Sequence, residues 1–96
     1  MSEITGPSAA IAHIRANVPL YFDRDDLDLR DWLNACVEER DNLSSGEQVM
    51  VDLAFACWNG SSGLQVYRLL HDLDKDTFLV AVQALTMTRG LITRQG

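Results

Sequence analysis

The chain has 96 residues, of which 47% are hydrophobic and 23% charged, with a net charge of −6 and an isoelectric point near 4.6. This length predicts one domain with a hydrophobic core, and this composition excludes general disorder. The acidic balance argues against nucleic acid as a partner, because a phosphate backbone is bound by basic surfaces.

The sequence carries no sign of a membrane segment or a secretion signal. Its apolar runs are far shorter than the roughly 20 residues that a membrane-spanning helix needs. The N-terminus lacks the basic start and apolar stretch of a signal peptide. We therefore expect a cytoplasmic protein without a membrane partner. It should have a flexible lead over residues 1–6, one helical domain over residues 7–92 and a polar tail over residues 93–96.

The first predicted helix covers residues 7–17, because Pro7 suits the first turn of a helix and Pro19 disfavours its continuation. Its apolar stripe consists of Ile11, Ile14 and Val18. His13 and Arg15 lie away from this stripe, so we expect both to be solvated. Residues 20–22 should form a short extended connector under the bundle.

The second predicted helix covers residues 26–40, after a cluster of aspartates that offers several N-caps. Its apolar residues recur every three or four positions, which predicts a single buried face. That face consists of Leu29, Trp32, Leu33, Cys36 and Val37.

The third predicted helix begins at a capping box, in which Ser44 and Glu47 close the helix N-terminus reciprocally, and it ends at Gly60. It is apolar over most of its circumference, as expected of a helix surrounded by others. We therefore place it at the centre of the fold, with the following side chains nearly solvent-free: Val49, Leu53, Phe55 and Cys57. Asp52 lies on its narrow polar stripe, and a buried Asp52 would mark that stripe as a place to look for function.

Residues 43–48, Leu-Ser-Ser-Gly-Glu-Gln, resemble the signature sequence of ABC-type ATPases. That resemblance would imply a nucleotide phosphate at the start of the third helix. However, the sequence has no phosphate-binding loop, and 96 residues are too few for that ATPase fold. The segment is therefore interpreted as a cap on a core helix.

Two further helices are predicted near the C-terminus, over residues 62–73 and 75–89. In the fourth we expect Tyr67 at the edge and four residues facing inward: Val66, Leu69, Leu70 and Leu73. The fifth should be capped by Asp74 or Asp76. It carries two apolar stripes on nearly opposite sides, one of Phe78, Val82 and Leu85 and the other of Val80, Ala84 and Met87.

The residue types needed for common chemistries are present in few places. Asp72, Asp74 and Asp76 have the spacing of the first calcium-loop ligands, but Thr77 and Gln83 stand where the loop needs Gly and Glu. Cys36 and Cys57 should be reduced core thiols, with a disulfide as the alternative if their helices meet. The two histidines, His13 and His71, belong to no catalytic motif. We therefore predict no metal, no cofactor and no catalytic residues.

Three patterns resemble small helical proteins of actinobacteria and their phages: Ser45-Gly46-Glu47, Leu53-Ala54 with Trp58-Asn59-Gly60, and Leu73-Asp74 with Arg89-Gly90. Those proteins have no known activity, so the resemblance implies none here.

The sequence as a whole predicts an all-α bundle of four or five helices around the central apolar helix. The leading functional hypothesis is a non-enzymatic protein-interaction or regulatory module, because the fifth helix has more apolar surface than one face can bury. We expect a contact with a second copy or another protein to be lined by Val80, Ala84, Met87 and Leu91. The competing explanation is that the first helix covers that face.

Two other functions use different surfaces. Residues 23–41 hold eight acids against three arginines, a net charge of −5. This segment could imitate a nucleic acid and occupy a partner's basic site, using Asp23, Asp25, Asp26, Asp28, Asp31, Glu38 and Glu39. The third and fourth helices could instead form a helix-turn-helix for DNA, but the would-be recognition helix has Arg68 as its one strongly basic residue.

Overall fold

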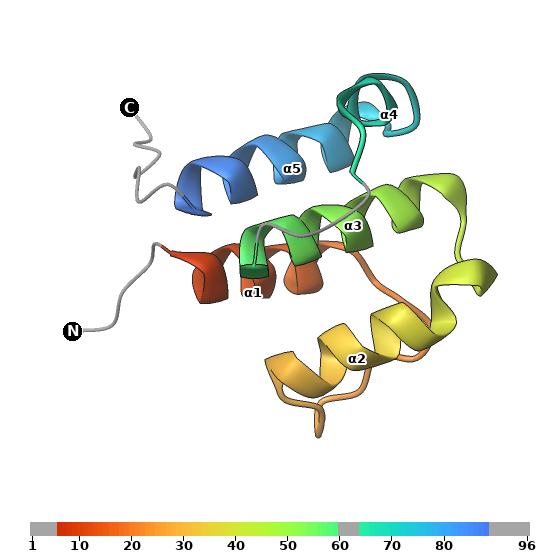
Figure 1. Ribbon diagram of the computed structural model, residues 1–96, viewed down its shortest axis with the longest axis vertical. Coiled ribbons are helices and arrows are strands. Elements are labelled where there is room, and N and C mark those ends of the chain that lie inside the picture. Colours follow the sequence, from red (N-terminus) through yellow and green to blue (C-terminus); the bar gives the residue numbers. More distant parts are fainter. Residues whose placement is uncertain (1–5, 60–63, 89–96) are drawn as a thin grey trace.

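The computed structural model describes residues 6–59 and 64–88. Over these residues the chain forms five α-helices and one 3-10 turn, without a strand (Figure 1). They are α1 (Pro7–Asn17), α2 (Leu29–Glu39), η1 (Arg40–Asn42), α3 (Ser45–Asn59), α4 (Val66–His71) and α5 (Lys75–Thr88). The predicted all-α fold is confirmed. The predicted lead, apart from Gly6, and the polar tail lie outside the described residues.

α3 is the central helix of the bundle and packs against α1, α2 and α5. Its predicted capping box is present: the Ser44 NH donates to Glu47 Oε1 over 3.0 Å, and the Glu47 NH donates to Ser44 Oγ over 3.3 Å. Val49, Leu53 and Cys57 are buried as predicted. Phe55 is only partly buried, contrary to prediction, because the continuous buried stretch of α3 covers residues 49–54 and the other helices cover the turns after it less completely.

α1 and α5 form an antiparallel pair that closes one side of the core. At one end of the pair, the Gly6 NH donates to the Met87 carbonyl over 2.6 Å. Gly6 has φ of 100°, which a glycine adopts without strain. Further along, His13 Nε2 is hydrogen-bonded to Gln83 Oε1 at 2.8 Å. The prediction that His13 is free in solvent is therefore wrong, because α5 lies beside that face of α1.

The connection between α1 and α2 is held by Arg15. Its guanidinium makes a bidentate ion pair with Asp23, with a shortest N–O distance of 2.7 Å, and donates to the carbonyls of Arg24 and Leu27. The side chain is 18% exposed, so the prediction that Arg15 is solvated is wrong. Arg15 lies off the apolar stripe of α1, but it faces residues 23–27 of the returning chain rather than water.

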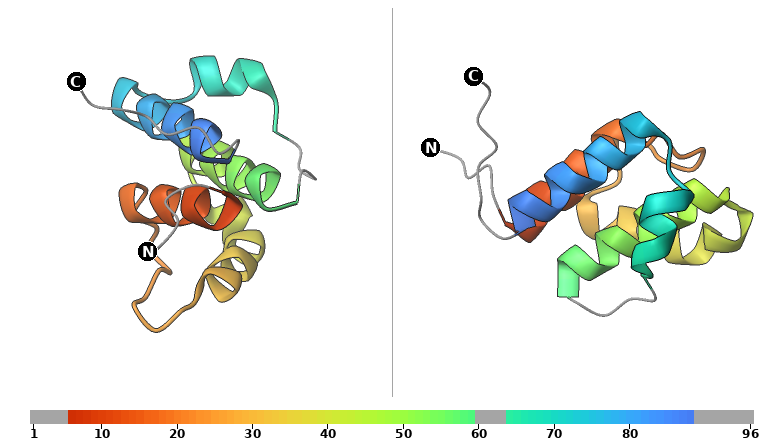
Figure 2. Two further views of the ribbon diagram at one scale, coloured as in Figure 1. Left: turned by 90° about the vertical axis from the view of Figure 1, so that its left-hand side faces the viewer. Right: turned by 90° about the horizontal axis from the view of Figure 1, so that it is seen from above.

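α2 lies at the end of the molecule opposite α5 (Figure 2). It begins at Leu29 rather than at residue 26, because the Asp28 carboxylate accepts a hydrogen bond from the Asp31 NH and caps the helix there. Trp32, Leu33 and Cys36 are buried, as predicted. Val37 is 57% exposed and does not belong to the buried face, since α2 is an edge helix with one packed side.

α4 is much shorter than the predicted helix, and its six residues make less than two turns. Leu69 is buried as predicted, and Leu73, beyond the helix, packs partly against the core. Val66 and Leu70 are 69% and 60% exposed, so the prediction that they face inward is wrong. A helix this short, resting on its neighbours by one side, presents its other residues to solvent.

Candidate interaction surface

The face of α5 that was predicted to meet a partner is turned into the molecule. Ala84 is fully buried, and Val80 and Met87 pack against the core. α1 is the helix with which α5 makes its most extensive contact. The predicted contact through Val80, Ala84 and Met87 is therefore wrong for the isolated chain, and the competing explanation holds because α1 covers these residues. Leu91, the fourth member, lies outside the described residues.

The opposite face of α5 is also apolar, and it is exposed. At about 100° per residue, this face gathers Phe78, Leu79, Val82 and Leu85, which are between 36% and 55% exposed. The sequence showed two apolar stripes on this helix but could not indicate which of them faces the core. The structure places the stripe of Phe78, Val82 and Leu85 outward and adds Leu79 to it.

α4, which lies on the same side of the molecule as α5, also carries exposed apolar side chains. α4 and α5 both lie above α3 in Figure 1, and both are in front in the view from above in Figure 2. Val66, Tyr67 and Leu70 of α4 are each at least 60% exposed. We call the exposed apolar residues of the two helices the outer apolar surface: Val66, Tyr67, Leu70, Phe78, Leu79, Val82 and Leu85.

The outer apolar surface carries little charge. Residues 77–88 include no acid, lysine or arginine. In α4, the Arg68 guanidinium is paired with Asp72, four residues on, at 2.9 Å. The acidic residues of the chain are concentrated instead in residues 23–41, in α2 and the loop before it, at the other end of the molecule. Most of the acidic charge is therefore separate from the outer apolar surface, which is bordered by the charged residues Asp72, Asp74, Lys75 and Asp76 between α4 and α5.

The predicted acidic surface is partly used within the fold. Asp23 is held by Arg15, Asp26 pairs with Arg24 at 3.1 Å, and Asp28 caps α2. Glu39 accepts hydrogen bonds from the Tyr21 hydroxyl and from Asn42, and these lower the pKa of the Glu39 carboxyl. The other residues of this predicted surface, Asp25, Asp31 and Glu38, are exposed. Its role as a binding site stays a prediction.

Asp52 is buried rather than on a wet stripe. Its carboxylate receives two hydrogen bonds from Arg40, at 3.0 Å from Nε and 2.7 Å from Nη2. The ion pair raises the pKa of the Arg40 guanidinium, and the Gln48 side chain donates to the Arg40 carbonyl at 3.0 Å. Asp52 and Gln48 thus both tie η1 to α3. The buried Asp52 is explained by structure and does not indicate a separate site.

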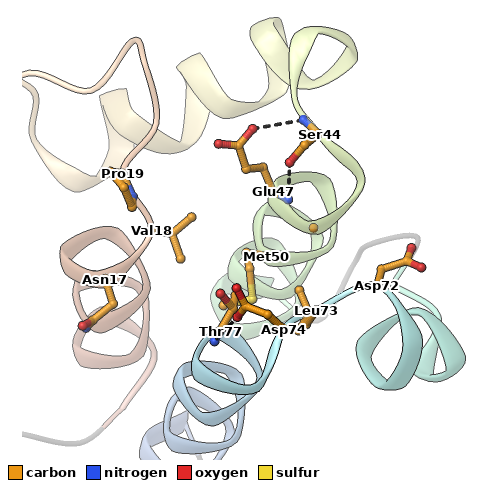
Figure 3. A pocket seen from close by; sticks show the side chains of 11 residues that line it. Asn17, Val18, Pro19, Ser44, Glu47, Met50, Asp72, Leu73, Asp74 and Thr77 are labelled. Atoms are coloured by element: carbon orange, nitrogen blue, oxygen red, sulfur yellow. Dashed lines mark hydrogen bonds between the residues drawn. The ribbon is translucent and has the colours of Figure 1, made fainter.

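A pocket of about 380 Å³ lies where α1 ends and where α3 and α5 begin (Figure 3). Its polar lining includes Ser44 and Glu47 of the capping box, together with Asp72, Asp74 and Thr77. These groups have hydrogen-bond or ion-pair partners. Ser44 and Glu47 bond to each other, Asp72 pairs with Arg68, and the Asp74 carboxylate accepts a hydrogen bond from the Thr77 NH at 2.7 Å. The polar groups of the pocket therefore serve to close helix ends.

The aspartates at the end of α4 are not arranged as a calcium loop. Asp74 caps α5 as predicted, and Asp72 is paired with Arg68. Within residues 6–59 and 64–88, no group of three His, Cys, Asp or Glu side chains is placed to hold a metal ion. The interpretation of residues 72–76 as a polar hinge between two helices agrees with these contacts.

Asp74 gives a prediction about acid stability. Hydrogen bonds from the backbone and side chain of Thr77 lower the pKa of Asp74 below its ordinary value of 3.8. A carboxyl with a lowered pKa stabilises the fold above its unfolded pKa and loses this effect as the pH falls through the folded pKa. Asp74→Asn keeps a capping oxygen but does not titrate. We expect the unfolding free energy of the wild type to fall relative to this variant below pH 3.8, as measured by urea unfolding. A difference that does not change with pH would contradict the role of Asp74.

The two cysteines are buried free thiols, as predicted for the reduced state. Burial, with a smaller effect of Asp23, raises the pKa of the Cys36 thiol to about 12, and burial also raises the pKa of Cys57. Since the thiolate is the reactive form, neither should react with an aromatic disulfide reagent at about pH 8 until the protein unfolds. Absorbance of the released thiolate measures this. Labelling of the folded protein as fast as that of free cysteine would contradict it.

Comparison of the chain with family models, with curated proteins and with solved structures found no match. The resemblance to small actinobacterial and phage proteins therefore stays a prediction. None of the described helices has the length and apolar composition required to cross a membrane.

Proposed function

We propose that this protein is an interaction module that binds another polypeptide through the outer apolar surface of α4 and α5. The observation that carries the proposal is the exposure of seven large apolar side chains on two neighbouring helices, while α5 already fills the core with its other face. A helix that packs on one side only would ordinarily be polar on the other. A monomer rarely leaves a large contiguous apolar patch in water.

The size of the surface supports this role. The exposed fractions of the seven residues range from 36% for Phe78 to 69% for Val66. With roughly 150–200 Å² for a whole large apolar residue, they expose on the order of 600 Å². This summed area over two adjacent helices is as large as the largest apolar patches on monomeric proteins, which are often functional. Tyr67 and Phe78 are also of the residue types enriched at binding hot spots and interfaces.

The other functional hypotheses have less support. Several carboxylates of the acidic segment are already paired with arginines or cap a helix, which reduces the charge free to imitate a nucleic acid. For the helix-turn-helix, α4 has only six residues, and its Arg68 is bound to Asp72. Recognition helices present several polar side chains to base edges, whereas the exposed residues of α4 are mainly apolar.

Site-specific photo-crosslinking in cells of the native host tests the proposal. A photoreactive phenylalanine derivative is placed at Leu85 on the outer apolar surface or at Val37 on α2, which are 43% and 57% exposed and both in the last turns of their helices. We expect covalent adducts with a polypeptide at Leu85 and none above background at Val37. Equal crosslinking at the two positions, or no adduct at Leu85, would overturn the proposal.

A further inference from the structure

We infer that the partner on the outer apolar surface is a second copy of this chain, with the two α5 helices packed antiparallel about a twofold axis. This inference rests on the proposed function and names the partner of that same surface. Its basis is the distribution of charge and apolar residues on α5 and over the whole molecule.

The surface is compatible with itself. A twofold interface brings the same patch of both copies together, so a charged residue in the patch would lie near charges of the same sign. Lys75 and Asp76 in the first turn are the charged residues of α5, and residues 77–88 have no charged side chain, so two α5 helices can approach along this length without repulsion. The acidic segment, which carries a net charge of −5, lies at the opposite end of the fold. In a dimer through α5, the two acidic segments would be at the far ends.

The ends of α5 decide between the two possible orientations. Asp74, Lys75 and Asp76 give its N-terminal end a net charge of −1, whereas the C-terminal half is uncharged. A parallel pair would place the two negatively charged ends side by side. An antiparallel pair places each acidic end beside the uncharged half of the other helix and also opposes the two helix dipoles favourably.

The spacing of the apolar residues suits this antiparallel arrangement. Phe78, Leu79, Val82 and Leu85 are distributed about Val82, so an axis near Val82 brings Leu79 of each copy next to Leu85 of the other. With α4 at the margin, the seven residues of each copy would contribute on the order of 600 Å² of surface. Stable interfaces bury about 800 Å² on each partner. The outer apolar surface would supply most of this area, and polar residues around it would supply the rest.

Sedimentation velocity on the purified full chain tests the inference. We expect the wild type to be dimeric at about 50 µM, in the range of ordinary weak dimers. Leu85→Lys should raise the dissociation constant by at least about 100-fold, because each interface would contain two unpaired lysines. The matched control is Val37→Lys, which also adds a lysine in the last turn of a helix and should leave the dimer unchanged. Circular dichroism establishes that both variants are folded.

A mixing experiment tests the orientation. Leu79→Glu and Leu85→Lys should each be monomeric alone. Mixed in equal amounts they should form a heterodimer, since antiparallel packing places the new glutamate beside the new lysine and leaves the other Leu79–Leu85 contact intact. In a parallel pair these two positions do not meet. Failure of the mixture to associate would therefore overturn the antiparallel arrangement.

The outcomes also separate this inference from the proposed function. A wild type that stays monomeric up to about 1 mM, or a dimer lost in Val37→Lys and kept in Leu85→Lys, would overturn the second copy as partner. If such a monomer still gives Leu85-specific adducts with a different polypeptide in cells, the interaction module stands and only the partner is wrong. If Leu85 gives no adduct at all, both fail.

Discussion

Replacing Ala84 with glutamate is expected to unfold most of the protein, whereas the same replacement at Leu85, one residue later, is expected to leave it folded. Ala84 is fully buried in the side of α5 that packs on the core, and Leu85, about 100° further round the helix, is 43% exposed. A carboxylate buried without a partner costs several kcal/mol, which is a large part of the roughly 5–15 kcal/mol that stabilises a domain.

Urea unfolding followed by circular dichroism measures this difference. The comparison is well matched, because both sites are in one helix and receive the same side chain. It tests directly which of the two apolar stripes of α5 faces the core. If Ala84→Glu were as stable as the wild type while Leu85→Glu unfolded, the helix would be oriented the other way, with the predicted Val80–Ala84–Met87 face outside.

The Arg40–Asp52 pair is the second site where a large effect is expected. Asp52→Ala should lower the free energy of unfolding by about 1–2 kcal/mol, since hydrogen bonds to charged groups contribute about 1.5–3 kcal/mol and Arg40 is partly solvated. The Arg40 side chain is 35% exposed and that of Asp52 only 11%, so water replaces the lost contacts incompletely.

Asp26→Ala is the control for this prediction. Asp26 also forms an ion pair with an arginine, Arg24, but the two side chains are 75% and 68% exposed. Exposed pairs contribute between about 0 and 1 kcal/mol, so the control should be close to the wild type. Urea unfolding of both variants gives the comparison. Equal and small effects would contradict the view that Asp52 anchors η1 to α3.

The positions of the helices followed from local signals in the sequence. The capping box at Ser44, Pro7 at the start of α1 and Asp74 before α5 each fix a helix end through contacts within one turn. These ends were predicted to within a residue. The start of α2 was misplaced because Asp26 and Asp28 are both suitable N-caps, and only the packed structure selects Asp28.

The candidate site was harder to predict, because it depends on which face of a helix meets its neighbours. α5 is apolar on two sides, so the hydrophobic pattern could not decide which side is buried. The partners of Arg15 and Asp52 lie 8 and 12 residues away in the sequence, and no periodicity relates them. Arg15 and His13 were predicted to be solvated because their partners come later in the chain. The loop after α1 covers Arg15, and α5 covers His13.

A dilution series followed by two-dimensional amide NMR tests the central claim most directly, because it identifies the residues that meet a second chain. Between about 10 µM and 1 mM, we predict that signals from the outer face of α5 and from α4 shift with concentration, while those around Val37 stay constant. Shifts confined to α2 and the acidic segment, or no shifts at all, would contradict the outer apolar surface as the place where two copies of this protein meet.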